Sequence, residues 1–131
     1  MQLAPSYHDV VAQVSTFLEQ RLQVAVEMGI AADRIVLDPG IGFGKTGRHN
    51  LQLLAHLDRL QRFGRPICLG VSRKGFIGKL LGREVWDRLV GSLAALGHAL
   101  SRGAVQIVRV HDVKQTRDFV EMWKEIEDVT A

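Results

Sequence analysis

Residues 66–74 read Pro-Ile-Cys-Leu-Gly-Val-Ser-Arg-Lys, a short apolar run that leads directly into polar residues. The same order recurs at residues 35–38, Ile-Val-Leu-Asp, and at residues 105–112, Val-Gln-Ile-Val-Arg-Val-His-Asp. Each run reads as a strand, and each is followed by a segment whose apolar residues have helical spacing. Strands that alternate with helices predict parallel strands joined by right-handed crossovers. The predicted fold class is therefore α/β, with helices covering at least one face of the sheet.

Four helical segments accompany these strands. A leading helix spans about Asp9 to Met28, and Asn50 is a good N-cap for a second helix that stops at Gly64. A third segment runs on to about Arg102. The fourth carries an apolar stripe to the end of the chain, formed by Phe119, Val120, Trp123 and Ile126. Three parallel strands alone leave two open edges, so we expect something to cover them.

The composition is that of an ordinary globular domain. Of the 131 residues, 47% are hydrophobic and 24% are charged, and 17 Lys+Arg against 14 Asp+Glu give a net charge of +3. The positive charge is scattered, which favours an anionic small molecule over nucleic acid as a ligand. The single Cys68 excludes a disulfide framework and a multi-cysteine zinc site, and no apolar run is long enough to cross a membrane. We expect one cytoplasmic domain.

Polar side chains follow all three predicted strands. Asp38 ends the first strand, Ser72 to Lys74 follow the second, and Arg109 and His111 end the third. Because the carboxyl ends of parallel strands share one face, we expect these groups to meet there and to form a pocket for an anion and a polar heterocycle. For single residues a simpler interpretation stays open. Asp38 before Pro-Gly is common turn chemistry, and Arg109 is compatible with a surface cation.

A glycine-rich stretch at residues 40–47, Gly-Ile-Gly-Phe-Gly-Lys-Thr-Gly, follows the first strand. It lacks the first glycine of a P-loop, since Pro39 stands there, and it lacks the acid that completes a dinucleotide-binding motif. Two interpretations remain open: a mobile loop that folds over a ligand with Phe43 as a lid, and a flexible connector.

Nothing in the sequence identifies a nucleophile or a metal site. Ser72 has no base at a predictable distance, and His111 has no further metal ligand at helical spacing beyond Asp112. The catalytic residues therefore stay unassigned at this level.

Three blocks of this sequence resemble the C-terminal half of dihydropteroate synthase. They occur in the family's order and spacing, and the resemblance covers essentially the whole chain. The blocks are Asp38 to Thr46 with His49-Asn50, Gly70 to Gly78, and Arg109 to Val113, with Arg88, Gly91 to Ala94 and Gly103-Ala104 between the last two.

The resemblance implies a transferase of folate biosynthesis and a target of sulfonamides. Such an enzyme condenses 7,8-dihydropterin-6-ylmethyl diphosphate with p-aminobenzoate, and it releases 7,8-dihydropteroate and pyrophosphate with the help of Mg²⁺. The implied fold is a TIM-type (β/α)8 barrel with outer helices. Residues 1–131 would be the C-terminal portion of its pterin-binding domain and would carry the last three βα units. A homodimer through the last helices, about 86–102 and 114–128, is implied as well.

The resemblance also assigns ligands to residues. The residues implied for the pterin are Asp38, Lys74, Phe43 and Gly70. Those implied for p-aminobenzoate are Ser72, Arg73, Lys74, Gly75 and Phe43, and those for the diphosphate are Arg109 and His111. Some relatives carry a serine at the position of Gly75, so a carboxylate contact there would come from backbone N–H groups. The ligands of Mg²⁺ are expected in the N-terminal half.

At 131 residues the chain is shorter than a complete barrel, which needs roughly 250 residues. We therefore expect a fragment that lacks the family's N-terminal half and is inactive alone. Two alternatives are an inactive stub that only oligomerises, and a pterin-binding methyltransferase domain. The arginine-histidine pair expected to bind a diphosphate argues against the methyltransferase, because methylfolates carry no diphosphate.

Overall fold

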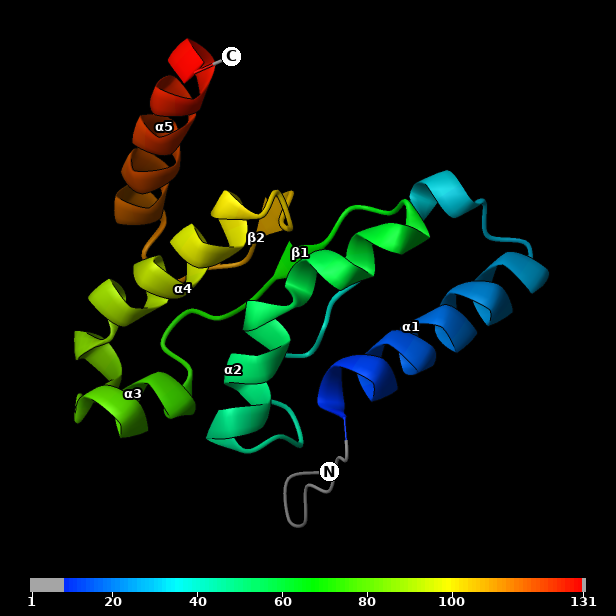
Figure 1. Cartoon of the computed structure of the whole chain (residues 1–131), viewed down its shortest axis with the longest axis horizontal. Helices are drawn as coiled ribbons and strands as arrows, with labels where there is room; N and C mark the ends of the chain where they lie inside the picture. The colour runs from blue at the N-terminus through cyan, green and yellow to red at the C-terminus, as the bar shows by residue number, and fades with distance from the viewer. Residues whose placement is uncertain (1–8, 131) are drawn as a thin grey trace.

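The computed structural model describes residues 9–130, with side chains up to residue 129. Helices and short strands alternate along the chain, and the strands lie between the helices (Figure 1). The α-helices are α1 (Val10–Glu27), α2 (Gly47–Ala55), α3 (Gly75–Leu81), α4 (Leu89–Ser101) and α5 (Val113–Thr130). Three 3₁₀ helices are η1 (Ala32–Arg34), η2 (Leu57–Phe63) and η3 (Val85–Asp87), and the strands are β1 (Cys68–Leu69) and β2 (Ile107–Val108). None of the described helices is long and apolar enough to span a membrane.

The sheet is parallel, as the alternation of elements predicts. Cys68 pairs with Ile107, and Leu37 forms a separate parallel bridge to Ile67. The predicted strand at 35–37 is reduced to this bridge. The reason lies opposite it, because Pro66 has no N–H to donate to Ile35, and the Arg65 side chain binds the Ile35 carbonyl at 3.1 Å instead.

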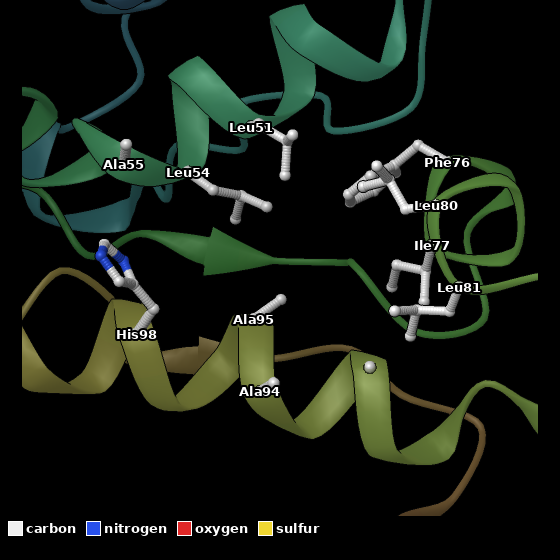
Figure 2. Close-up of a pocket in the computed structure, with 11 residues that line it drawn as sticks. Leu51, Leu54, Ala55, Phe76, Ile77, Leu80, Leu81, Ala94, Ala95 and His98 are labelled. Carbon is white, nitrogen blue, oxygen red and sulfur yellow. The ribbon is translucent and has the colours of Figure 1, made fainter.

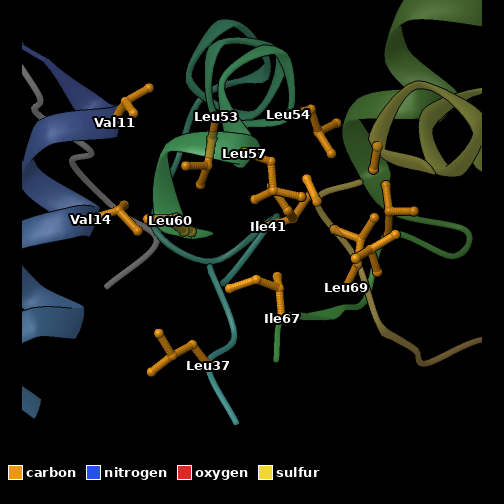
Figure 3. Close-up of a cluster of buried hydrophobic side chains, with 14 of the residues drawn as sticks. Val11, Val14, Leu37, Ile41, Leu53, Leu54, Leu57, Leu60, Ile67 and Leu69 are labelled. Atoms are coloured by element: carbon orange, nitrogen blue, oxygen red, sulfur yellow. The ribbon is translucent and has the colours of Figure 1, made fainter. Parts of the chain in front are cut away.

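A hydrophobic core fills the space between the helices and one face of the sheet (Figure 3). The helices contribute one wall, and the sheet contributes Leu37, Ile67 and Leu69, each at most 4% exposed. Figure 3 shows the helical part of this core, which includes Val11, Val14, Leu53, Leu54, Leu57 and Leu60. The predicted cover on at least one face of the sheet is thus present.

The opposite face of the sheet is open. Successive residues of a strand point to opposite faces, so Val36 and Ile107 point away from the core, and they are 45% and 44% exposed. The next positions on this same face lie two residues nearer the carboxyl ends of the three strand segments. They are occupied by Asp38, Gly70 and Arg109. The open face therefore carries apolar residues that lead to polar groups at one rim.

Two predicted helices differ from the observed ones. Thr46, not Asn50, caps α2, because its side chain accepts from the backbone N–H of His49 while the His49 ring accepts from the backbone N–H of Thr46. Asn50 lies inside the helix and is buried. The predicted helix then continues as η2 and ends at Gly64, where the backbone turns left-handed with φ 67°.

The predicted segment to Arg102 is three helices instead of one. Gly82 ends α3 with φ 67°, and η3 separates it from α4. Gly91 lets α4 approach α3 closely, since a Cβ there would overlap Ile77. The predicted first and last helices are confirmed as α1 and α5, and Phe119 of α5 packs on Gly97 of α4.

Candidate functional site

The rim at the carboxyl ends of the strands holds an ion pair between the first and third strand segments. Arg109 Nη1 lies 2.8 Å from Asp38 Oδ2. The other carboxylate oxygen, Oδ1, accepts from the backbone N–H of Gly40 at 2.9 Å. Asp38 therefore takes part both in the turn and in the cluster of polar groups, and its hydrogen bond raises the pKa of Arg109.

Gly70 is the surface on which Arg109 lies. A Cβ built on Gly70 would overlap the Arg109 guanidinium group. Only a residue without a side chain lets this planar group rest against the backbone at the end of β1. The absence of a side chain at Gly70 therefore lets the Arg109 guanidinium group lie directly against the backbone on the open face.

Lys74 extends from the loop after β1 to the glycine-rich loop. Its Nζ lies 4.3 Å from the centre of the Phe43 ring, a cation–π contact. Burial lowers the pKa of Lys74, the nearby Arg109 lowers it further, and Asp38 opposes the change. Lys74 therefore contacts Phe43 and is close enough to Arg109 and Asp38 for their charges to affect it, so these residues belong to one site.

The glycine-rich loop has internal hydrogen bonds that hold its shape. Lys45 Nζ donates to the carbonyls of Gly40 and Phe43 at 2.7 and 2.8 Å, and Asn50 Oδ1 accepts from the Gly42 N–H at 2.8 Å. Desolvation lowers the pKa of Lys45. The sequence does not predict these roles of Lys45 and Asn50, because a lysine that folds back on its own loop has no local signal and Asn50 fits a helix cap by residue type.

Ser72 and His111 form a pair across two strand ends. Ser72 Oγ lies 3.0 Å from His111 Nδ1 and also accepts from the His111 backbone N–H at 3.2 Å. The sequence offered no base near Ser72, since the two residues are 39 positions apart and meet only when the strands pair.

Arg73 is held on three sides. It is the one non-glycine residue with positive φ (57°) in the part of the chain that the structure describes. Its backbone N–H donates to Ser92 Oγ, its carbonyl accepts from Arg88 Nη1, and its guanidinium group pairs with Asp112 at 2.8 Å. The hydrogen bond with Arg73 lowers the pKa of Asp112. These contacts fix the backbone that leads to Lys74.

Two cavities meet at Lys74. One, of about 160 Å³, is lined by Gly70, Ser72, Lys74, Arg109, Val110 and His111. The other, of about 720 Å³, lies between the glycine-rich loop and α3, and its lining includes Gly42, Lys45, Asn50, Lys74, Gly75 and Phe76. Six of the predicted site residues line one or both of these cavities, and Lys74 lines both. Asp38, Phe43 and Arg73 line neither cavity. Asp38 and Phe43 instead contact residues that do, Arg109 and Lys74 respectively.

A third pocket lies between α2, α3 and α4 (Figure 2). It measures about 310 Å³ and is lined almost wholly by apolar side chains such as Leu54, Ile77 and Leu80. Its one ionisable side chain, His98, lies at the end away from α3 in Figure 2. This pocket contains none of the rim residues on which the predicted chemistry depends.

No metal site is present within residues 9–130. Nowhere among them do three His, Cys, Asp or Glu side chains gather closely enough to hold an ion. Asp38, the carboxylate at the centre of the rim, is already bound by Arg109 and Gly40. The residues at hand do not fit Mg²⁺ by themselves.

Comparison with known proteins places this geometry in a family. The model for "Pterin binding enzyme" matches residues 1–111. The chain belongs to the pterin binding enzyme family. Among curated members, the dihydropteroate synthase of Neisseria meningitidis serogroup C is 48% identical over 126 residues, which are 95% of this chain and 44% of that protein. The dihydropteroate synthase of Escherichia coli K12 is 46% identical over 116 residues, 88% of this chain and 41% of that enzyme.

Solved dihydropteroate synthases share the fold. That of Xanthomonas albilineans in complex with 7,8-dihydropteroate is 45% identical with a TM-score of 0.91, over 97% of this chain and 48% of that one. A second Xanthomonas albilineans structure, with 4-aminobenzoic acid, is 46% identical with a TM-score of 0.91, over 95% and 45%. The Yersinia pestis enzyme in a sulfonamide drug complex is 39% identical with a TM-score of 0.93, over 98% and 46%. The chain thus spans less than half of the length of each of these relatives.

Proposed function

We propose that the protein to which this chain belongs is a dihydropteroate synthase. It would join p-aminobenzoate to 7,8-dihydropterin-6-ylmethyl diphosphate and release pyrophosphate. The observation that carries the proposal is the pair of cavities that meet at Lys74, because a condensation needs two substrates side by side. Similarity to the Xanthomonas albilineans structures with 7,8-dihydropteroate and with 4-aminobenzoic acid supports it.

Arg109 and His111 are suited to the diphosphate. The planar guanidinium group binds phosphate oxygens with two N–H groups at once, and the imidazole adds a further donor. The carbon–oxygen bond breaks with its electron pair leaving on the pyrophosphate, so negative charge grows there in the transition state. A fixed cation and a fixed hydrogen-bond donor at that place stabilise the transition state more than the ground state.

Asp38, Lys74, Gly70 and Phe43 are suited to the pterin. An ionised Asp38 would accept from the amino and ring N–H groups of the heterocycle. The space above Gly70 is taken by the Arg109 guanidinium group, so a flat ring would reach Gly70 only if Arg109 moved aside. Arg109 is already paired with the Asp38 carboxylate at 2.8 Å, so the pterin would compete with Arg109 for that carboxylate. The carboxylate would also favour positive charge on the pterin as the leaving group departs.

We assign the second cavity to p-aminobenzoate. Its walls include Lys74 and Gly75, and the loop that contains Ser72 and Arg73 leads to it. Phe43 contacts Lys74, which lines this cavity, and would reach the same substrate from the glycine-rich loop. The amine nitrogen would attack the methylene carbon and form the new carbon–nitrogen bond, and its proton would pass to solvent. The amine is already nucleophilic, so positioning matters more than activation.

The rest of the protein would complete the fold. We propose that the bridge at Leu37, β1 and β2 belong to the last three βα units of a (β/α)8 barrel in the cytoplasm, and that the N-terminal half supplies the other strands and the Mg²⁺ ligands. A homodimer through α4 and α5 would cover exposed apolar residues, which include Val90, Val113, Met122 and Ile126.

The test is pyrophosphate release by the full-length protein with both substrates and Mg²⁺. Lys74→Ala and Arg109→Ala should each reduce turnover by on the order of a hundredfold or more. Lys114→Ala, an exposed cation on α5, is the matched control and should change little. Near-normal turnover in both site variants would contradict the proposal, as would transfer of a methyl group in place of pyrophosphate release.

A further inference from the structure

The Ser72 hydroxyl makes two contacts with a single residue. Its Oγ lies 3.0 Å from His111 Nδ1 and 3.2 Å from the His111 backbone nitrogen. Ser72 is 7% exposed, so this hydroxyl depends on protein partners rather than on bulk water.

The backbone contact uses one of the two lone pairs of the Ser72 oxygen and leaves the hydroxyl proton available to donate. A backbone N–H can only donate, so Ser72 Oγ is the acceptor in the contact with the His111 amide. The single proton of the hydroxyl then needs an acceptor of its own, and within residues 9–130 His111 Nδ1 is the acceptor in place. When Nδ1 accepts a proton in this way, the neutral ring carries its own proton on Nε2.

We propose that Ser72 is a positioning residue that holds neutral His111 in the Nε2–H tautomer. The proposal rests on the proposed function, in which His111 binds the diphosphate. Nε2–H donates to an oxygen of an anion, whereas a bare Nε2 would present its lone pair to that oxygen and repel it. Ser72, Arg109 and His111 line the same cavity of about 160 Å³, so an anion there would meet the guanidinium group and the ring together.

The same contacts separate Ser72 from the aminobenzoate carboxylate. Because the hydroxyl proton is committed to the His111 ring, the loop at 72–75 would bind that carboxylate through backbone N–H groups and Lys74. Loss of the hydroxyl should therefore weaken binding of pyrophosphate more than binding of p-aminobenzoate.

Nitrogen NMR of the 131-residue chain with ¹⁵N-labelled histidine tests the tautomer directly. At about pH 8.5, well above the usual histidine titration, a protonated ring nitrogen and a bare one give widely separated signals. His111→Gln identifies the signals of His111. The expected result is a protonated Nε2 in the wild type and a mixture of tautomers in Ser72→Ala. A wild-type ring protonated on Nδ1, or no change in Ser72→Ala, would overturn the proposal.

Two further variants separate this role from a merely structural one. Ser72→Thr keeps a hydroxyl and should keep the Nε2–H form. Ser15→Ala removes an equally buried hydroxyl from α1, where Arg62 is its partner, and should leave the His111 signals unchanged. A shift of the His111 tautomer in Ser15→Ala would mean that general loosening, and not the Ser72 hydroxyl, sets it.

Titration with inorganic pyrophosphate in the same spectra links the tautomer to binding. Pyrophosphate should move the His111 Nε2 signal, and Ser72→Ala should weaken the apparent affinity in proportion to the fraction of the ring that leaves the Nε2–H form, about twofold for an equal mixture. An unchanged affinity in Ser72→Ala would overturn the binding role of Ser72. A protonated Nε2 that pyrophosphate does not move would instead contradict the proposed diphosphate site, and Ser72 would still set the tautomer.

Discussion

At the scale of single residues, the contact between Gly70 and Arg109 is the most exacting in the site. Gly70→Ala places a Cβ where the guanidinium group now lies, so Arg109 must leave its place beside Asp38. We expect pyrophosphate affinity of the full-length protein to fall about tenfold or more, since a charge-assisted contact is lost. Isothermal titration calorimetry with pyrophosphate measures this change.

A second glycine variant is the control for Gly70→Ala. Gly47→Ala adds the same methyl group at the start of α2, where the nearest atom, Phe76 Cβ, is at an ordinary 3.9 Å. Its pyrophosphate affinity should match the wild type. Equal losses in both variants would show that Gly70 has no special relation to Arg109.

Residue patterns predict which groups gather at the rim but not how they pair. Asp38 and Arg109 stand at the ends of separate strands, and parallel pairing alone brings them to one face. The Ser72–His111 hydrogen bond and the contacts of Lys45 to its own loop depend on side-chain rotamers, which no spacing rule encodes. The positive φ of Arg73 is equally hidden, because its support comes from Ser92 and Arg88 on later elements.

At the scale of secondary structure elements, the start of α2 governs the glycine-rich loop. Thr46 caps the helix, and the first turn then carries Asn50 to the Gly42 N–H. Thr46→Ala removes the capping oxygen and should lower the free energy of unfolding by about 1 kcal/mol. Urea unfolding measures it. Thr46→Ser keeps the oxygen and should retain most of the stability, whereas an equal loss in both variants would argue against capping as the cause.

The Arg73–Asp112 ion pair joins the loop before α3 to the start of α5. Arg73 lowers the pKa of Asp112 in the folded chain. The ion pair therefore stabilises the fold fully at a pH above 3.8, the ordinary pKa of an aspartate, and this stabilisation is lost as the pH falls through the lower pKa of the folded chain. Asp112→Asn should therefore be less stable than wild type at about pH 7, and the difference should shrink toward about pH 2.5. Urea unfolding at both pH values measures it; a constant difference would exclude the ion pair as the cause.

Element boundaries illustrate the limit of sequence periodicity. The second predicted helix contributes buried leucines, Leu53, Leu54, Leu57 and Leu60, but the cap that begins α2 is four residues earlier than the predicted Asn50. Asn50 fits a cap by type, yet its oxygen binds the loop instead. Pro66 shortens the first strand because it lacks the N–H that would bind Ile35, an effect that appears only once the partner strand is known.

At the scale of the whole molecule, the open face of the sheet is the feature that a complete barrel would explain. Val36 and Ile107 are about half exposed although they lie on strand segments, where such residues are ordinarily buried. In a closed barrel this face would point inward and be covered by the N-terminal half. The same residue should therefore behave differently in the chain alone and in the full-length protein.

Ile107→Lys tests this difference. In the 131-residue chain the lysine would reach solvent from the open face, so the free energy of unfolding should change little, and self-association should decrease. In the full-length protein the same lysine would be buried without a partner and should cost about 3 kcal/mol or more. Urea unfolding of both lengths, with sedimentation velocity for the chain alone, measures the contrast. Met28→Lys, at a site that is 79% exposed after α1, should be neutral at both lengths. A neutral Ile107→Lys in the full-length protein would mean that the N-terminal half does not cover this face, and the barrel would have to be abandoned.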